Sequence, residues 1–261
     1  MDESLFPATR PQALLWALKE HFPRFVLLSL LSFLFAFPLW IYFLFFSFYF
    51  SAPEAFSLRY LLSYLALIPL TAIAFLGQGG LFWCAKKTAF LEGNSPKEEF
   101  FLGVKQTYRE SLLSGFVFSL NYVLLKFALS FLLSLSLPTY AYPCLAGFLY
   151  CLAFLLDLSS SFLLPQGVLY SSSTPQSYLN SWRFFLGGFL LNVPLFLLVC
   201  LPWLVFEIFP TFWVYLGLSL FYFLFYAFFS ALLWTYRSHS LFDKAINQEQ
   251  YPQIYRKGLR K

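Results

Sequence analysis

The stretch that decides the fold is FVLLSLLSFLFAFPLWIYFLFFSFYF at residues 25–50, which contains no charged side chain. A helix needs about 20 apolar residues to cross the hydrocarbon core of a bilayer, so this stretch is long enough to span one. Five further long apolar runs follow it, at residues 59–82, 112–137, 143–166, 186–208 and 212–236. The sequence therefore predicts an all-α, polytopic membrane protein with six transmembrane helices.

The composition agrees with a membrane location. Of the 261 residues, 60% are hydrophobic and only 11% are charged, whereas a soluble domain carries roughly 25% charged residues. This number of charged groups is too small for the whole surface of the protein to face water. We expect the lipid bilayer to be the main partner and the net charge of +5 to meet anionic lipid, with no nucleic-acid partner.

The position of the positive charges predicts the topology. Nearly all of the 17 Lys and Arg residues fall in the N-terminal segment, in alternate gaps between the apolar runs, or in the tail. They are Arg10, Lys19, Arg24, Lys86, Lys87, Lys97, Lys105, Arg109, Arg183, Arg237, Lys244, Arg256, Lys257, Arg260 and Lys261. Short loops rich in positive charge stay in the cytoplasm, so we expect both termini on the cytoplasmic side of a bacterial inner membrane. An even number of spans is then required, and six satisfies this.

Three parts follow from this topology. Residues 1–24 form a cytoplasmic N-terminal segment with a short helix around 11–20, and residues 25–236 form the six-helix transmembrane domain. Residues 237–261 form a cytoplasmic tail, which we expect to be a helical extension running out into solvent. The first apolar run is too long for a cleaved signal peptide, so we expect it to remain as an anchor.

Two short amphipathic helices are predicted on the cytoplasmic face. Each start has a capping residue followed by proline, which suits the first helical turn: Ser95-Pro96-Lys97-Glu98 and Ser173-Thr174-Pro175-Gln176. Aromatic residues then recur on one side of each helix, and we expect them to lie in the acyl boundary of the membrane. These residues are Phe100, Phe101 and Tyr108 in the first helix, and Tyr178 and Trp182 in the second.

A weak internal repeat accompanies these helices. The second apolar run ends in GQGGLF at 77–82, and the fourth ends in PQGVLY at 165–170. Each is followed by a polar linker, a helix start and the next span. An internal repeat and chance similarity in an apolar chain both explain the pattern, and the sequence leaves both open. The glycines of 77–80 are expected to allow close helix packing, because small residues let backbones approach.

Two charges are predicted to lie deep in the membrane, Lys126 in the third span and Asp157 in the fourth. Counted from the short outer turn near 138–143, they lie about 17 Å and 21 Å deep at 1.5 Å per residue, so we expect them to form an ion pair. With Ser130, Tyr150 and Ser161 they would form a polar seam. The pair is either a clamp that fixes helix pairing or a substrate or proton site facing a cavity. Asn121 and Asn192 are expected to bond neighbouring helices.

Motifs for other chemistry are absent from the sequence. The four cysteines form no CxxC, the two histidines are far apart, and residues 77–80 lack the Gly-Lys-Ser/Thr ending of a phosphate loop. We therefore predict no cofactor, no metal site and no enzymatic activity.

Several segments resemble one bacterial family. They are GGLFWCAKK at 79–87, EGN at 92–94, EFFLGVKQTYRES at 99–111 and FDK at 242–244. Together they resemble the YesL-like integral membrane family. The resemblance implies a six-span protein of unassigned activity, found among genes for carbohydrate uptake, and hence an accessory or scaffold protein with a partner such as an ABC-type permease. The polar seam supports a different hypothesis, a small transporter or a component of one.

Overall fold

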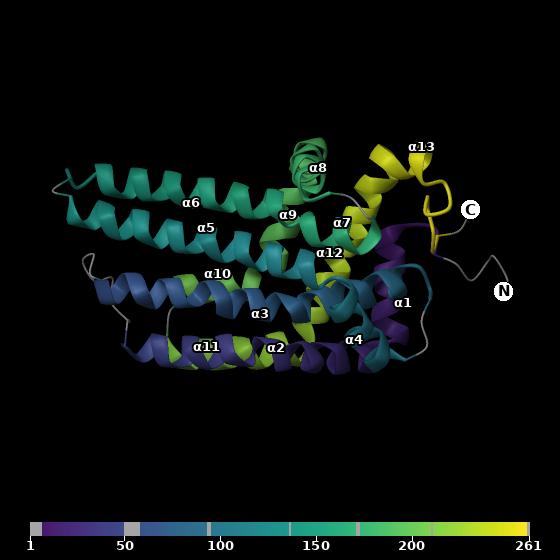
Figure 1. Cartoon of the computed structure of the whole chain (residues 1–261), viewed down its shortest axis with the longest axis horizontal. Helices are drawn as coiled ribbons and strands as arrows, with labels where there is room; N and C mark the ends of the chain where they lie inside the picture. The colour runs from purple at the N-terminus through teal and green to yellow at the C-terminus, as the bar shows by residue number, and fades with distance from the viewer. Residues whose placement is uncertain are drawn as a thin grey trace.

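The computed structural model describes residues 7–49, 58–92, 95–135, 137–170, 173–209 and 211–259. For residues 46–49 and 58–61 only the backbone is described. Gly93 and Asn94, which belong to the EGN segment of the family resemblance, are not among the described residues. All regular elements in the described residues are helical, and most of them run along one elongated bundle (Figure 1). The all-α prediction is therefore confirmed.

Five helical segments are long and apolar enough to cross a membrane. They are α2 (Phe22–Tyr49), α3 (Leu58–Ala89), α5 (Tyr108–Ser134), α6 (Ala141–Ser160) continued by α7 (Leu163–Leu169), and the C-terminal segment from α11 (Phe212–Phe221) through η2 (Tyr222–Tyr226), α12 (Ala227–Phe242) and η3 (Asp243–Asn247) to α13 (Gln248–Gln250). A sixth is present only if a bent pair of helices counts as one span. The chain is thus a multi-pass membrane protein with five to six candidate spans.

The outer surface of these helices is apolar. Leu190 is 86% exposed, Phe148 64% and Leu34 61%, and many other large apolar side chains also point outward. A soluble protein rarely leaves so large an apolar surface in contact with water. This surface is suited to contact with lipid chains.

The predicted fifth span, residues 186–208, is not one straight helix. The chain bends by 105° between α8 (Thr174–Gly187) and α9 (Phe189–Val199), and it breaks again before α10 (Leu201–Ile208). Pro202 has no N–H group to donate to the carbonyl of Leu198 four residues earlier. That carbonyl accepts a hydrogen bond from the hydroxyl of Tyr226 instead, so a neighbouring helix stabilises the break.

The bundle has two different ends. At one end, here called the terminal end, lie α1 (Arg10–Glu20), α4 (Pro96–Gln106), the last part of α12, and α13 (Figure 1). At the opposite, distal end, α5 and α6 are joined through residues 135–140. With 32 residues, α3 is about 48 Å long, more than the roughly 30 Å of a bilayer's hydrocarbon core. The hydrocarbon core of a bilayer therefore cannot cover both ends of α3.

Helices form at the two predicted positions, as α4 and α8, each with proline in its first turn, and Tyr108 begins the next helix, α5. Their amphipathic placement at the membrane surface stays a prediction. Phe101, Tyr108 and Tyr178 are exposed, and Trp182 is half-buried against other aromatic rings. Phe100 is fully buried in the core of the terminal end, together with Phe25 and Phe228. The prediction that Phe100 faces lipid is therefore wrong, because α4 packs this side chain against α2 and α3 rather than against the membrane.

The C-terminal segment is helical as predicted, but it does not run out into solvent. Asp243 and Asn247 are buried, and Asp243 forms an ion pair with Arg10 of α1 at 3.0 Å. The hydroxyl of Tyr170 donates a hydrogen bond to Asn247. These polar contacts hold the tail against the rest of the terminal end.

The two Gln-Gly segments of the suggested repeat meet at one place. Gly79 packs against Thr107 and Ser111, and Gly167 packs against Glu110, so both approach the start of α5 with no room for a β-carbon. Close packing, as predicted for residues 77–80, is confirmed. A repeat of the whole unit remains a prediction.

Candidate functional site

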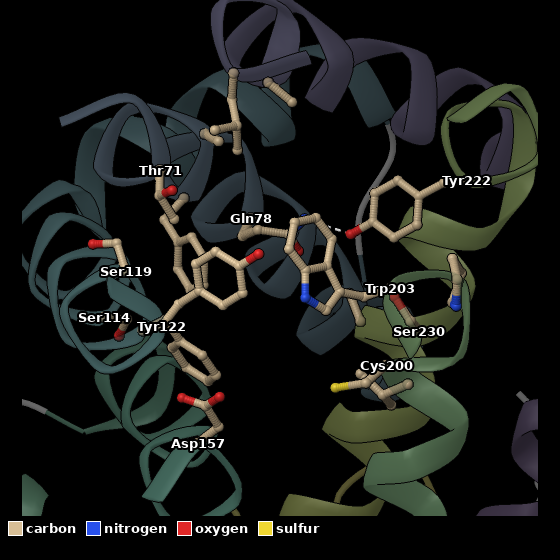
Figure 2. Close-up of a pocket in the computed structure, with 18 of the residues that line it drawn as sticks. Thr71, Gln78, Ser114, Ser119, Tyr122, Asp157, Cys200, Trp203, Tyr222 and Ser230 are labelled. Carbon is tan, nitrogen blue, oxygen red and sulfur yellow. Dashed lines mark hydrogen bonds between the residues drawn. The ribbon is translucent and has the colours of Figure 1, made fainter. Parts of the chain in front are cut away.

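A cavity of about 420 Å³ lies inside the bundle. Its walls come from α2, α3, α5, α6, α9, α10, α11, η2 and α12, so helices from both ends of the sequence enclose it (Figure 2). Most of the lining is apolar and aromatic. Its polar groups are few, and they include Gln78, Tyr122, Asp157, Cys200 and Tyr222.

Asp157 of α6 is the acidic residue of this cavity. The Nδ2 atom of Asn121 donates a hydrogen bond to Oδ1 of Asp157 at 2.7 Å, and the same amide reaches the carbonyl of Ala153 at 3.0 Å. The carboxylate points into the cavity from the wall opposite Cys200 (Figure 2). Asn121 thus links two helices, as predicted, and it also orients the acid.

Lys126 does not pair with Asp157, which corrects the prediction. Its Nζ atom lies 2.8 Å from Oε2 of Glu207 in α10, while the hydroxyl of Tyr122 donates to Oε1 of Glu207 at 2.8 Å. Asn121 of α5 lies at the same depth as Asp157, because the two side chains are hydrogen-bonded. Lys126 lies about 7.5 Å further along α5, at 1.5 Å per residue. The two charges therefore lie at different depths.

The break at Pro202 explains how Glu207 reaches Lys126. A straight fifth span would place Glu207 near its outer end, beside water. Instead α10 begins anew at Leu201 and brings Glu207 against α5. The side chains of Lys126 and Glu207 are 14% and 22% exposed, so the ion pair is largely shielded. The pair joins α5 to α10 beside Tyr122, which is itself a wall of the cavity.

The remaining seam residues separate. Ser161 lines the cavity, and its carbonyl accepts a hydrogen bond from Nε1 of Trp234 at 3.0 Å. Ser130 is buried in α5, and Tyr150 is exposed on α6. The predicted seam is thus divided between Asp157 and Ser161 in the cavity and Lys126 in a separate ion pair.

A second polar contact of the cavity was not predicted. Nε2 of Gln78 donates to the hydroxyl of Tyr222 at 3.0 Å (Figure 2). Tyr222 begins the π-helical turn η2, and the hydroxyl of Ser29 in α2 bridges the end of that turn, donating to the carbonyl of Phe225 and accepting from the N–H of Phe228. Such turns are often found at functional sites. The sequence signal for it is an amide within an apolar span, beside glycines for which close helix packing is predicted.

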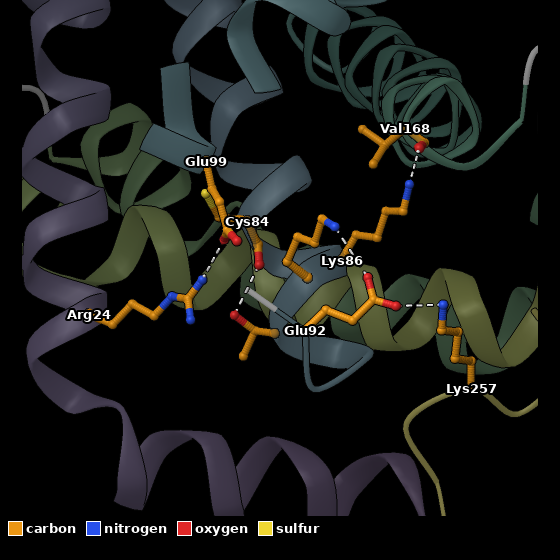
Figure 3. Close-up of polar contacts among 9 residues, drawn as sticks. Arg24, Cys84, Lys86, Glu92, Glu99, Val168 and Lys257 are labelled. Carbon is orange, nitrogen blue, oxygen red and sulfur yellow. Dashed lines mark hydrogen bonds and ion pairs between the residues drawn. The ribbon is translucent and has the colours of Figure 1, made fainter. Parts of the chain in front are cut away.

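Polar contacts at the terminal end are of a different kind. Arg24 forms an ion pair with Glu99 at 3.0 Å, and Nζ of Lys86 donates to the carbonyl of Val168 at 2.8 Å (Figure 3). Glu92 accepts hydrogen bonds from both Lys87 and Lys257. Burial raises the pKa of Glu92, but the hydrogen bonds from the two lysines outweigh it and hold the pKa below its ordinary value.

The bend between α8 and α9 is also held by polar groups. Asn192 donates to the carbonyls of Phe184 and Phe185, and Nε of Arg237 donates to Oδ1 of Asn192 at 2.7 Å. The guanidinium of Arg237 also reaches the carbonyl of Gly188 at 3.1 Å. The prediction that Asn192 bonds neighbouring helices is confirmed.

Within the described part of the chain, no three His, Cys, Asp or Glu side chains cluster closely enough to hold a metal ion. In comparisons with known proteins, no family model, curated protein or solved structure matches the chain. Membership of the YesL-like family therefore stays a prediction.

Proposed function

We propose that this protein binds a small molecule inside the membrane and acts as a small transporter or as a component of one. The observation that carries the proposal is the cavity of about 420 Å³ with the carboxylate of Asp157 pointing into it. Ligand pockets are typically about 300–1,000 Å³, mostly apolar, with a few placed polar groups. Ionisable side chains within membrane segments are rare, and they commonly mark pathways for substrates or protons.

We further propose six spans with both termini in the cytoplasm of a bacterial inner membrane. One observation supports this orientation. The cations of α1, α4 and the C-terminal segment gather at the terminal end, which the positive-inside rule assigns to the cytoplasm. The predicted fifth span would then consist of α9 and α10 rather than of the bent pair α8 and α9, and α4 and α8 would lie at the cytoplasmic surface.

The accessory role in carbohydrate uptake has weaker support. A sugar carries many hydroxyl groups that need hydrogen-bond partners, and the mostly apolar lining offers few of them. A link to carbohydrate uptake would therefore act through a partner, such as an ABC-type permease, and not through this cavity. Co-purification from native membranes in mild detergent tests that role.

The cysteines of the chain provide a direct test of the cavity. Cys200 lines it, whereas Cys84 is fully buried in the core of the terminal end. Two variants would each keep one of these cysteines and replace the other three by alanine. We expect a small membrane-permeant thiol reagent to label Cys200 at least about tenfold faster than Cys84. Equal resistance of the two thiols would overturn the proposal, because a closed cavity admits no ligand.

A further inference from the structure

We infer that the occupant of the cavity is a hydrophobic organic cation, a molecule with one amine or quaternary ammonium group on an apolar body. The inference rests on the proposed function and names the ligand class for the same cavity. The Oδ1 atom of Asp157 is bonded by Asn121, and in the described residues its Oδ2 atom has no hydrogen-bond partner. Lys126, the residue expected to neutralise it, is held by Glu207.

Charge balance favours a cation from outside the chain. An ionised carboxylate inside a membrane protein is costly unless a cation pairs with it or a proton neutralises it. A neutral amide orients Asp157 but supplies no positive charge. A positively charged ligand group would complete the contact at Oδ2, and an anionic ligand would be repelled by it.

The walls are suited to the same ligand. The rings of Tyr122 and Trp203 lie edge to face at 5.7 Å between centroids, and the rings of Phe196 and Trp234 lie 5.6 Å apart. All four residues line the cavity. Aromatic faces attract cations, including quaternary ammonium groups that have no hydrogen-bond donor. The rest of the lining is apolar and would hold the hydrophobic body.

Hydrogen bonds within the protein engage two tyrosine hydroxyl groups of the lining. The hydroxyl of Tyr122 is used by Glu207, and the hydroxyl of Tyr222 accepts from Gln78. The two rings therefore line the cavity, while their hydroxyl groups bond to the protein itself. The open carboxylate oxygen of Asp157 is therefore the group best placed to select a ligand.

The test uses Cys200 as a reporter, because it faces Asp157 across the cavity (Figure 2). In the variant whose sole cysteine is Cys200, labelling is measured with benzyltrimethylammonium and with its neutral isostere, neopentylbenzene. We expect the cation to protect Cys200 at concentrations at least about tenfold lower than the neutral compound. Asp157→Asn in the same background is expected to remove that preference.

The outcomes separate the two proposals. Equal protection by both compounds would overturn the cation inference while the cavity remained a binding site. Labelling of Cys200 that neither compound slows would also overturn the inference. If Asp157→Asn fails to fold, the comparison of the two compounds in the protein that keeps Asp157 still tests the preference for a cation. A Cys200 thiol as unreactive as Cys84 would reject the proposed function itself.

Discussion

The terminal end and the cavity are formed by many of the same helices, but they satisfy their polar groups differently. At the terminal end, Arg10 pairs with Asp243 and Arg24 with Glu99, and aromatic side chains fill the space between α1, α4 and α12. Around the cavity, the amide of Asn121 is the one side chain among the described residues that bonds to Asp157, and space remains beside it. The difference supports the proposal that the cavity is left open for a ligand, while the ion pairs of the terminal end hold the helices together.

The largest effect is expected from breaking the Arg10–Asp243 pair. The side chains are 9% and 10% exposed, so Arg10→Met leaves a buried carboxylate without its cation. We expect a loss of about 3–5 kcal/mol in the free energy of unfolding, measured by denaturation in detergent micelles. Lys97→Met, at an exposed cation of α4, is the matched control and should cost less than about 0.5 kcal/mol. Equal effects of the two changes would contradict a packed terminal end.

Enlarging a cysteine in each region tests the difference in packing. Cys84→Phe forces a ring into a filled core, and we expect it to cost about 1–3 kcal/mol in stability. Cys200→Phe places the same ring in the cavity and should cost less than about 1 kcal/mol while it blocks ligand binding. Thermal unfolding of both purified variants measures this. A larger loss for Cys200→Phe than for Cys84→Phe would show that the cavity is not open space.

A double-mutant cycle tests the corrected partner of Lys126. Lys126→Met and Glu207→Gln remove the two sides of one ion pair, so their effects on stability should be coupled by about 1–2 kcal/mol. Lys126→Met and Asp157→Asn share no contact and should be additive within about 0.5 kcal/mol. Stronger coupling of Lys126 to Asp157 than to Glu207 would restore the pairing predicted from the sequence.

The smallest expected effect is on the stability of the protein at low pH. Because the folded-state pKa of Glu92 lies below its ordinary value, Glu92 contributes stability above its unfolded pKa, and this is lost as the pH falls through the folded pKa. Glu92 is about one-third exposed, so the loss should stay below about 1 kcal/mol. Unfolding curves at a series of pH values below 6 should show less acid destabilisation in Glu92→Gln than in the parent protein. Identical pH dependence would exclude a role for these lysines in folding stability.

Much of the fold followed from local sequence. Length and hydropathy predicted the membrane helices, and the Ser-Pro and Thr-Pro starts predicted α4 and α8, because these signals act within a few residues. The partner of Lys126 depended on Pro202, which breaks the fifth span and moves Glu207. A proline in a run predicts a break or a kink, but it does not give the direction in which the next segment turns.

The cavity could be predicted only in part. Asp157 and Ser161 were chosen because polar groups within an apolar span are unusual, and both line the cavity. Gln78 carried the same signal, but its glycine neighbours favoured a packing role. The open space itself depends on how side chains from many helices fill the interior. The sequence of any one helix is therefore not enough to predict it.

The Arg10–Asp243 contact also bears on how the protein is made. The two residues are 233 positions apart, and at about 5–20 residues per second a ribosome needs roughly 12–47 seconds to pass from one to the other. During that interval the guanidinium of Arg10 has no carboxylate at residue 243 to meet. Docking of α1 on α12 is therefore a late event in biosynthesis, and a nascent chain that stalls before Asp243 would lack this contact.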